Sequence, residues 1–262
     1  MNARHIVSIA LLGASALAAH SAQAADPTIW VVDSAGKLGT VNVNTGAASL
    51  IGNTGQSMYD IAFDPSGKLW GVSGYNNTLY SINTSTGAST AVGALGTGIN
   101  ALVFGSNGTL YGASGGSLYS INTTSGASTL IGSGSYSSVG DLAFVGGKLF
   151  LSSYGSSTNG LWQLDTTTGA GTSISSTTSM AYTALGSPDG STLYGVVDHS
   201  VYRVNVSTGA ATFLSTYDST LGSGYGGAFT TEAIAAVPEP SSYALLAAGL
   251  GCVGFVVRRR RA

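Results

Sequence analysis

Short runs of alternating apolar and polar residues recur through the middle of the chain at a spacing of about 40 residues. A clear unit covers residues 110–132, and related units begin at Ile29, Leu69, Leu149 and Leu193. Each run is only four to six residues long and is bounded by Gly, Ser, Thr and Asn, which is typical of short strands joined by turns. The pattern therefore predicts five similar units built from strands.

The unit that begins before Leu69 shows how its strands are arranged. The expected strands cover residues 60–63, 68–72, 79–83 and 89–93, with the first at the centre of the fold and the last outermost. The turns between them contain Gly and Asn, which accept positive φ, and Pro65, which presets a turn corner. Four such strands repeated at this period are typical of a propeller blade.

The two ends of the repeat region complement each other. The first unit begins at its second strand, at Ile29, whereas an extra apolar strand, Gly227-Ala228-Phe229, follows the fifth unit. In a closed ring this last strand completes the first blade and removes two free edges. We therefore expect an all-β fold, a five-bladed β-propeller of four-stranded antiparallel blades. A ring of six or seven blades with degenerate units, a flat solenoid and a β-sandwich are the alternatives.

Composition supports an all-β fold. Charged residues make up 8% of the chain, which has 39 glycines, and helix-favouring Glu, Lys and Arg are scarce. The same composition would suit a disordered stalk, but the regular apolar positions indicate that surface is buried. Residues 25–236 carry ten acidic residues against only Lys37, Lys68, Lys148 and Arg203. Nucleic acid and anionic lipid are therefore poor partners.

The N-terminus has the features of a secretory signal. Arg4 and His5 precede an apolar stretch over residues 6–19, and Ala22-Gln23-Ala24 has the small-x-small spacing that signal peptidase accepts. We expect residues 1–24 to be removed, residues 25–235 to form the propeller and the mature chain to be exported across the inner membrane. Its single cysteine, Cys252, rules out an intrachain disulfide.

Residues 236–262 form a segment of different character. They contain Val237-Pro238-Glu239-Pro240, an apolar run over residues 243–257, and the cluster Arg258, Arg259, Arg260 and Arg261. The prolines favour extended backbone that a protease can reach. The apolar run is short for a transmembrane helix, which needs roughly 20 residues, and the arginines should hold its end on the cytoplasmic side. The segment is therefore expected to be a marginal membrane anchor.

This order of Pro motif, apolar helix and arginine cluster resembles the PEP-CTERM tail. The resemblance implies a bacterium that makes exopolysaccharide, recognition of the Pro-Glu-Pro segment by an exosortase-type enzyme, and release from a transient inner-membrane anchor to the cell surface or extracellular matrix. It covers the tail alone and implies no molecular activity. A single-pass anchor that is never cut is the alternative.

Candidate chemistry is sparse and comes from the expected architecture. The loops that enter the inner strands of a propeller converge at the mouth of its channel, and they place four polar side chains there: Asp60, Asn100, Asp141 and Tyr182. With Tyr59, Tyr136 and Tyr225 nearby, this rim could hold a cation or hydrogen-bond a sugar. Alternatively, Asp60 and Asp141 cap backbone turns with their side chains.

The sequence offers little for catalysis. After signal cleavage His199 is the only histidine, and His and Cys show no metal-ligand spacing. We expect no metal, no cofactor and no enzymatic activity, and a role in binding exopolysaccharide or matrix proteins in a biofilm. One alternative is a polysaccharide hydrolase that uses Asp60 and Asp141, because glycoside hydrolysis needs paired carboxyl groups. A membrane-anchored periplasmic scaffold or sensor is another.

Overall fold

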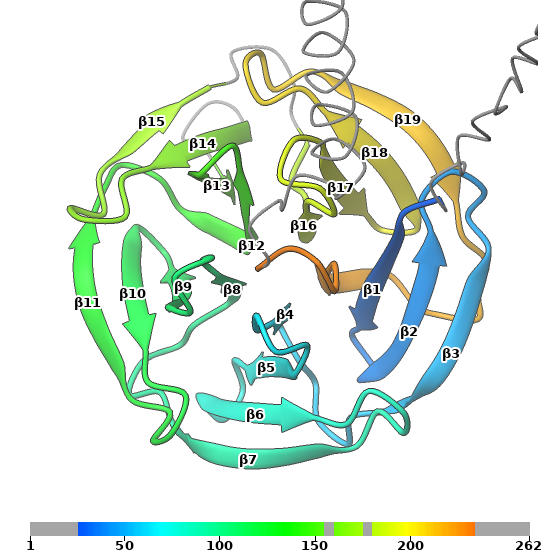
Figure 1. Ribbon diagram of the computed structural model, residues 1–262, viewed down its shortest axis with the longest axis horizontal. Helices are drawn as coiled ribbons and strands as arrows, with labels where there is room; N and C mark the ends of the chain where they lie inside the picture. Colours follow the sequence, from blue (N-terminus) through cyan, green and yellow to red (C-terminus); the bar gives the residue numbers. More distant parts are fainter. Residues whose placement is uncertain (1–25, 155–159, 175–179, 234–262) are drawn as a thin grey trace, which may run out of the picture.

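The computed structural model describes residues 26–154, 160–174 and 180–233, and these form five four-stranded antiparallel sheets around a central axis (Figure 1). The predicted five-bladed β-propeller is confirmed. The strands are β1 (Thr28–Asp33), β2 (Lys37–Asn42), β3 (Ala48–Asn53), β4 (Asp60–Phe63), β5 (Leu69–Ser73), β6 (Thr78–Ile82), β7 (Ser89–Ala94), β8 (Ala101–Phe104), β9 (Leu110–Ser114), β10 (Ser117–Ile121), β11 (Ser128–Ser133), β12 (Ser138–Val145), β13 (Lys148–Ser153), β14 (Gly160–Leu164), β15 (Gly171–Ser173), β16 (Ala184–Gly186), β17 (Leu193–Val197), β18 (Ser200–Val204), β19 (Ala211–Thr216) and β20 (Gly224–Ala228).

The blades follow the chain in order, apart from the first. The first blade consists of β20, β1, β2 and β3, and the second, third, fourth and fifth blades take β4–β7, β8–β11, β12–β15 and β16–β19. The expected signal peptide over residues 1–24, the sorting motif at 237–240, the apolar run at 243–257 and the arginines at 258–261 lie outside the described residues. Within the described residues, no helix is long and apolar enough to cross a membrane.

Ring closure occurs where the sequence predicts it. The C-terminal strand β20 pairs antiparallel with β1, with Val31 opposite Gly227 and Val32 opposite Gly226. The buried Asp33 side chain reinforces this seam: Oδ1 accepts the Lys37 amide at 2.9 Å, while Oδ2 accepts the Gly222 amide at 2.8 Å. One carboxylate thus joins the β1–β2 turn to the loop that precedes β20.

The repeated turn between the third and fourth strands of each blade explains much of the sequence repeat. In the second blade, Asn83 Oδ1 accepts the amides of Ser85 at 2.9 Å and Thr86 at 3.0 Å, and Gly87 closes the turn at a φ of 77°. The same side-chain turn begins at Asn42, Asn122, Asp165 and Asn205. The turn also packs on the preceding blade, because a Cβ at Gly52 would collide with the carbonyl oxygen of Thr86. This contact explains why glycine is present at both position 52 and position 87.

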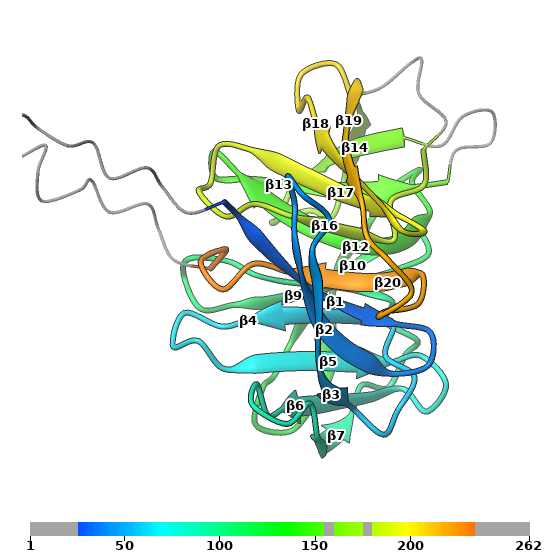
Figure 2. The same cartoon turned by 90° about the vertical axis from the view of Figure 1, so that its right-hand side faces the viewer.

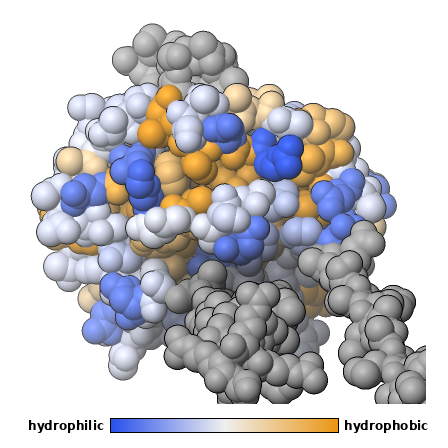
Figure 3. Space-filling model, turned by 45° about the horizontal axis from the view of Figure 1, so that its top comes forward, coloured by the Kyte–Doolittle hydropathy of each residue, from blue (hydrophilic) through white to orange (hydrophobic). Residues whose placement is uncertain are grey.

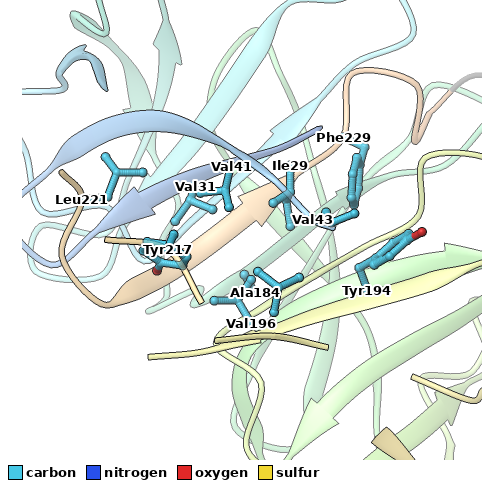
Figure 4. Packing of buried hydrophobic residues seen from close by; sticks show 11 residues of the cluster. Ile29, Val31, Val41, Val43, Ala184, Tyr194, Val196, Tyr217, Leu221 and Phe229 are labelled. Carbon is cyan, nitrogen blue, oxygen red and sulfur yellow. The ribbon is translucent and has the colours of Figure 1, made fainter. Parts of the chain in front are cut away.

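Apolar side chains fill the spaces between neighbouring blades. Figure 4 shows the cluster between the first and fifth blades, where Ile29 and Val31 of β1 face Val196 of β17, and Phe229 lies beside Tyr194. The rings of Tyr194 and Phe229 are 5.6 Å apart. Complete burial of a side chain such as Ile29 or Val31 stabilises the fold by about 1.5–3 kcal/mol. The interface between the first and fifth blades is therefore packed like the other interfaces between blades, each of which has its own apolar cluster.

The rim of the disc carries apolar residues as well. In Figure 3, hydrophobic positions form a broad area on the side of the molecule, bordered by hydrophilic ones. Three large exposed side chains occupy equivalent positions on outermost strands: Leu50 on β3, Leu130 on β11 and Phe213 on β19. Each lies immediately before a register shift in the pairing of its strand.

The two faces of the disc differ in what they carry. Strands β4 and β20 run in the same direction, and Figure 2 shows that both end on the side where the described chain begins and ends. We call this side the tail face; it carries the inner hairpin turns and residues 229–233. We call the opposite side the entry face; there the inner strands begin, near Tyr59, Asn100, Gly140, Thr183 and Tyr225. The chain therefore leaves the propeller on the tail face.

Candidate functional site

The innermost strands place one residue each at the same level of the channel. Strand register defines the equivalence, because Asp60 pairs with Val72, Ala101 pairs with Ala113, and the same position of the fifth blade pairs Ala184 with Val196. Going round the ring, the five equivalent residues are Gly226, Asp60, Ala101, Asp141 and Ala184. Carboxyl groups therefore alternate with small residues at the centre of the fold.

At two of the four predicted rim residues, this register differs from the one expected from the sequence. Asn100 lies one position before the ring residue Ala101, and Tyr182 lies two positions before Ala184. Of the four predicted rim residues, the ring includes only Asp60 and Asp141. Asn100 lines the mouth above the ring, as described below. Tyr182 lies elsewhere: its ring is buried against Gly195 between blades, and burial raises the pKa of its phenol to about 12.

Asp60 and Asp141 have matching environments. Asp60 accepts the amide of its neighbour Ile61 at 2.7 Å and the amide of Leu102, in the next blade, at 2.5 Å. Asp141 repeats this arrangement, with Leu142 at 2.5 Å and Leu185 of the following blade at 2.6 Å. The amides belong to innermost strands, whose channel-facing edges have no further strand to pair with, so the carboxyl groups satisfy donors that would otherwise be buried without partners.

The two carboxyl groups also hydrogen-bond each other. Burial raises the pKa of both Asp60 and Asp141 well above the usual range, because neither side chain has any exposed surface. A hydrogen bond between two carboxyl groups requires a proton on at least one of them, so the pair holds at least one proton. Gly226 completes the packing, because a Cβ there would collide with the Cα of Asp60.

Above this ring, the entry face has a hollow of about 240 Å³. It is lined by Tyr59, Asn100, Val139, Gly140, Tyr154, Thr183 and Tyr225. Asn100 donates its amide to the Ser138 carbonyl at 3.2 Å, but its Oδ1 is buried with no partner. Thr183 donates its hydroxyl to the Gly224 carbonyl at 2.5 Å. The hollow therefore contains an unused hydrogen-bond acceptor.

Tyr59, Tyr154 and Tyr225 line this hollow, and Tyr75 packs against Tyr59. The Tyr59 ring lies 5.6 Å from that of Tyr75 and 6.4 Å from that of Tyr225. Tyr75 is 77% exposed, Tyr154 is 55% exposed and Tyr225 is 40% exposed, so their faces are open to a ligand. Gly74 leaves room for the Tyr59 ring, because a Cβ at position 74 would overlap that ring. We call Tyr59, Tyr75, Tyr154 and Tyr225 the entry-face tyrosines.

The sequence identified only part of this cluster. Tyr59 and Tyr225 were expected there, whereas Tyr75 and Tyr154 were missed; both follow the second strand of a blade, in loops that reach the same face. Tyr136, which was also expected, is buried and donates its hydroxyl to the Gly169 carbonyl at 3.0 Å. Among the described residues, no group of three or more His, Cys, Asp or Glu side chains could hold a metal ion.

Two sequence families match the chain. Residues 236–261 match the PEP-CTERM protein-sorting motif, and residues 13–131 match a repeat of unknown function. No curated protein is significantly similar in sequence. The sorting motif implies an exported protein with a C-terminal membrane-anchoring tail that an exosortase-type enzyme processes.

Solved structures share the fold at low identity. A symmetrical protein from a study of de novo evolutionary emergence is 18% identical, with a TM-score of 0.53 over 73% of this chain and 94% of its own. A chain of the nidogen/laminin complex is 12% identical, with a TM-score of 0.55 over 78% and 81%. A structural genomics protein of unknown function from Bacteroides thetaiotaomicron is 13% identical, with a TM-score of 0.54 over 73% of this chain but 56% of its own. The chain is a five-bladed β-propeller built from repeats that carries a PEP-CTERM sorting motif at its C-terminus.

Proposed function

We propose that this protein is a non-catalytic component of the cell surface or extracellular matrix that binds a polysaccharide through the entry-face hollow. The entry-face tyrosines carry the proposal. Exposed aromatic rings are suited to the apolar faces of sugar rings, while a few fixed polar groups select their hydroxyls. The unpartnered Oδ1 of Asn100 is such a group, since it can accept a hydrogen bond from a sugar hydroxyl.

The position of the tail supports this function. The described chain ends at Ala233 on the tail face, and the sorting motif begins at residue 236. The hollow is lined by residues of the entry face, and the two faces lie on opposite sides of the disc (Figure 2). A propeller held by its tail would therefore direct the hollow away from the attachment point, toward extracellular polymer.

The environment of Asp60 and Asp141 favours binding over hydrolysis. A glycosidase needs one carboxyl group to protonate the leaving oxygen and another to act as base or nucleophile. Here both groups are fully buried, and each accepts two backbone amides in addition to their mutual hydrogen bond. These contacts support a structural role in which the pair joins neighbouring blades.

The direct experiment combines binding with turnover. The full chain, purified in detergent, is incubated with an array of bacterial polysaccharide fragments, and the solution over each bound fragment is analysed for products. The proposal expects saturable binding without products. Products that disappear in Asp60→Asn would instead support the hydrolase. A mature chain that keeps Arg258–Arg261 by mass spectrometry would support the membrane-anchored scaffold or sensor.

A further inference from the structure

The tail face has a second hollow that the proposed function does not use. It has a volume of about 490 Å³ and lies beside the inner hairpin turns of the third and fourth blades. Tyr111 and Phe144 form part of its wall, with ring centroids 5.7 Å apart, and Asn107 and Thr166 also line it. Glu232, the only glutamate in residues 25–236, contributes a carboxyl group.

Glu232 reaches the hollow because the chain crosses the end of the channel after β20. Phe229, at the start of the crossing, packs against Tyr194 of the fifth blade. Ala233, at the end of the described crossing, is buried with Trp70 and Phe104 of the second and third blades. Both ends of this short segment are therefore fixed in apolar clusters, which sets the position of the Glu232 side chain.

The carboxyl group of Glu232 is only half satisfied. Its Oε2 accepts the amide of Phe229 at 3.4 Å, and the Ser187 amide also interacts with the carboxyl group. Its Oε1 is buried and has no hydrogen-bond partner. Burial raises the pKa of Glu232 to about 8, and the carboxyl groups of Asp60 and Asp141 are close enough for charge on Glu232 to raise their pKa values as well. A buried acceptor without a donor is costly, so a donor from outside the chain would be stabilising there.

The surroundings indicate which donor would fit. None of the residues that line the hollow is basic, and the excess of acidic over basic residues in residues 25–236 also favours a cation. Aromatic rings attract cations, and a hydrogen bond between an ammonium and a carboxylate is stronger than one between neutral groups. We infer that this hollow binds a primary ammonium group of a small organic ligand, with Glu232 as its counter-ion beside Tyr111 and Phe144.

Proton release distinguishes this site from a neutral one. An ammonium group favours the ionised form of Glu232, so below about pH 8 the carboxyl proton must leave when the ligand binds. Calorimetry of the full chain with D-glucosamine, in buffers that differ in ionisation enthalpy, should therefore detect proton release at pH 6 and much less at pH 9. Asp60 and Asp141 are close enough to Glu232 for its charge to affect their pKa values, so they are further acidic groups near this hollow.

Substitutions and analogues complete the test. Glu232→Gln keeps the shape of the side chain, and we expect it to weaken D-glucosamine binding at least tenfold, whereas Asp218→Asn, in an exposed loop, should leave affinity unchanged. N-acetyl-D-glucosamine should not bind, while ethanolamine should bind if the ammonium alone is sufficient. Far-ultraviolet circular dichroism shows whether the Glu232→Gln variant is folded. If the variant is unfolded, the proton release of the wild type on binding D-glucosamine still tests the inference.

Several results would overturn the inference. These are equal binding of the amine and its N-acetyl analogue, unchanged affinity in a folded Glu232→Gln variant, absence of proton release at pH 6, and absence of binding at millimolar amine. The result is independent of the polysaccharide proposal, because Tyr75→Ala and Tyr225→Ala change the opposite face and should leave D-glucosamine binding at Glu232 intact.

Discussion

The carboxyl groups of Asp60 and Asp141 hydrogen-bond each other at the centre of the propeller, although they belong to the second and fourth blades. Each also accepts an amide from the following blade, at Leu102 and Leu185. Four of the five innermost strands are thus connected by two side chains. The pair therefore links blades at the centre of the fold, in addition to the apolar packing and the turn contacts between neighbouring blades.

Removal of one member of this pair should destabilise the fold. Asp60→Ala leaves the amides of Ile61 and Leu102 buried without an acceptor and the Asp141 carboxyl group without its partner. Each buried donor left unsatisfied costs about 1–3 kcal/mol, so we expect the free energy of unfolding to fall by about 2–5 kcal/mol. Urea unfolding measures this loss. Asp218→Ala, at an exposed loop, is the control, and an equal effect of both substitutions would refute the structural role.

Glu232 should make the protein less stable as pH rises. Its folded pKa of about 8 lies above the ordinary glutamate value of 4.5, so the folded state binds the proton more tightly than the unfolded state. The resulting stability is fully present below about pH 4.5 and is lost as pH rises toward 8, by up to a few kcal/mol. Raised pKa values of Asp60 and Asp141 act in the same direction.

The Glu232→Gln variant isolates this contribution. Unfolding midpoints measured at pH 5 and pH 8 should differ less in Glu232→Gln than in the wild type, because the amide does not titrate. Four other carboxyl groups have lowered pKa values: those of Asp64, Asp165, Asp189 and Asp218. Their contribution to the stability of the fold is lost only in more acidic solution. An identical pH dependence in wild type and variant would show that Glu232 is ionised in the fold.

Gly226 should not tolerate a side chain. A Cβ at this position would collide with the Cα of Asp60, and both atoms are held by strand pairing. We expect Gly226→Ala to lower the free energy of unfolding by about 1–3 kcal/mol. Gly98→Ala is a suitable control, because the nearest atom to its Cβ is the Oδ1 of Asn77 at 3.4 Å. Thermal unfolding measures both variants, and equal midpoints for Gly226→Ala and Gly98→Ala would contradict tight packing at the centre of the ring.

The sorting motif predicts a change in location. In a host that contains the sorting enzyme, Pro238→Ala combined with Pro240→Ala should leave the chain in the inner membrane with its tail uncut, because the substitutions remove the prolines of the sorting motif. Cell fractionation and mass spectrometry of the C-terminus measure this. Wild-type protein in a host without the enzyme should behave like the variant, and normal release of the variant would contradict recognition through Val237–Pro240.

The sequence determines the architecture because its repeats are local. Each blade carries the same apolar runs and the same side-chain turn, such as Asn83 to Gly87, and the missing first strand is supplied by β20. These features depend on residues that are close in the sequence, so they can be predicted from the sequence alone. The prediction that Asp60 and Asp141 occupy equivalent positions of their blades follows from the same regularity.

The details of the site depend on less regular segments. The connections before β8 and β16 contain Gly, Ser and Thr without a period of two, so register could not be fixed to one residue, and Asn100 and Tyr182 were placed where Ala101 and Ala184 lie. The position of Tyr75 depends on how a loop folds over Tyr59. The environment of Glu232 depends on where the chain crosses the channel, which no sequence pattern specifies.

The affinity of the entry-face tyrosines for matrix polysaccharide is the most direct measurement. Equilibrium binding of the full chain to exopolysaccharide from an exosortase-containing bacterium should weaken about tenfold or more when Tyr75→Ala and Tyr225→Ala are combined, since each ring interaction is worth about 0.5–1.5 kcal/mol. Phe213→Ala removes an aromatic ring of intermediate exposure from the rim and should leave affinity unchanged. Unchanged affinity in the double variant, or an equal loss in Phe213→Ala, would contradict polysaccharide binding at the entry face.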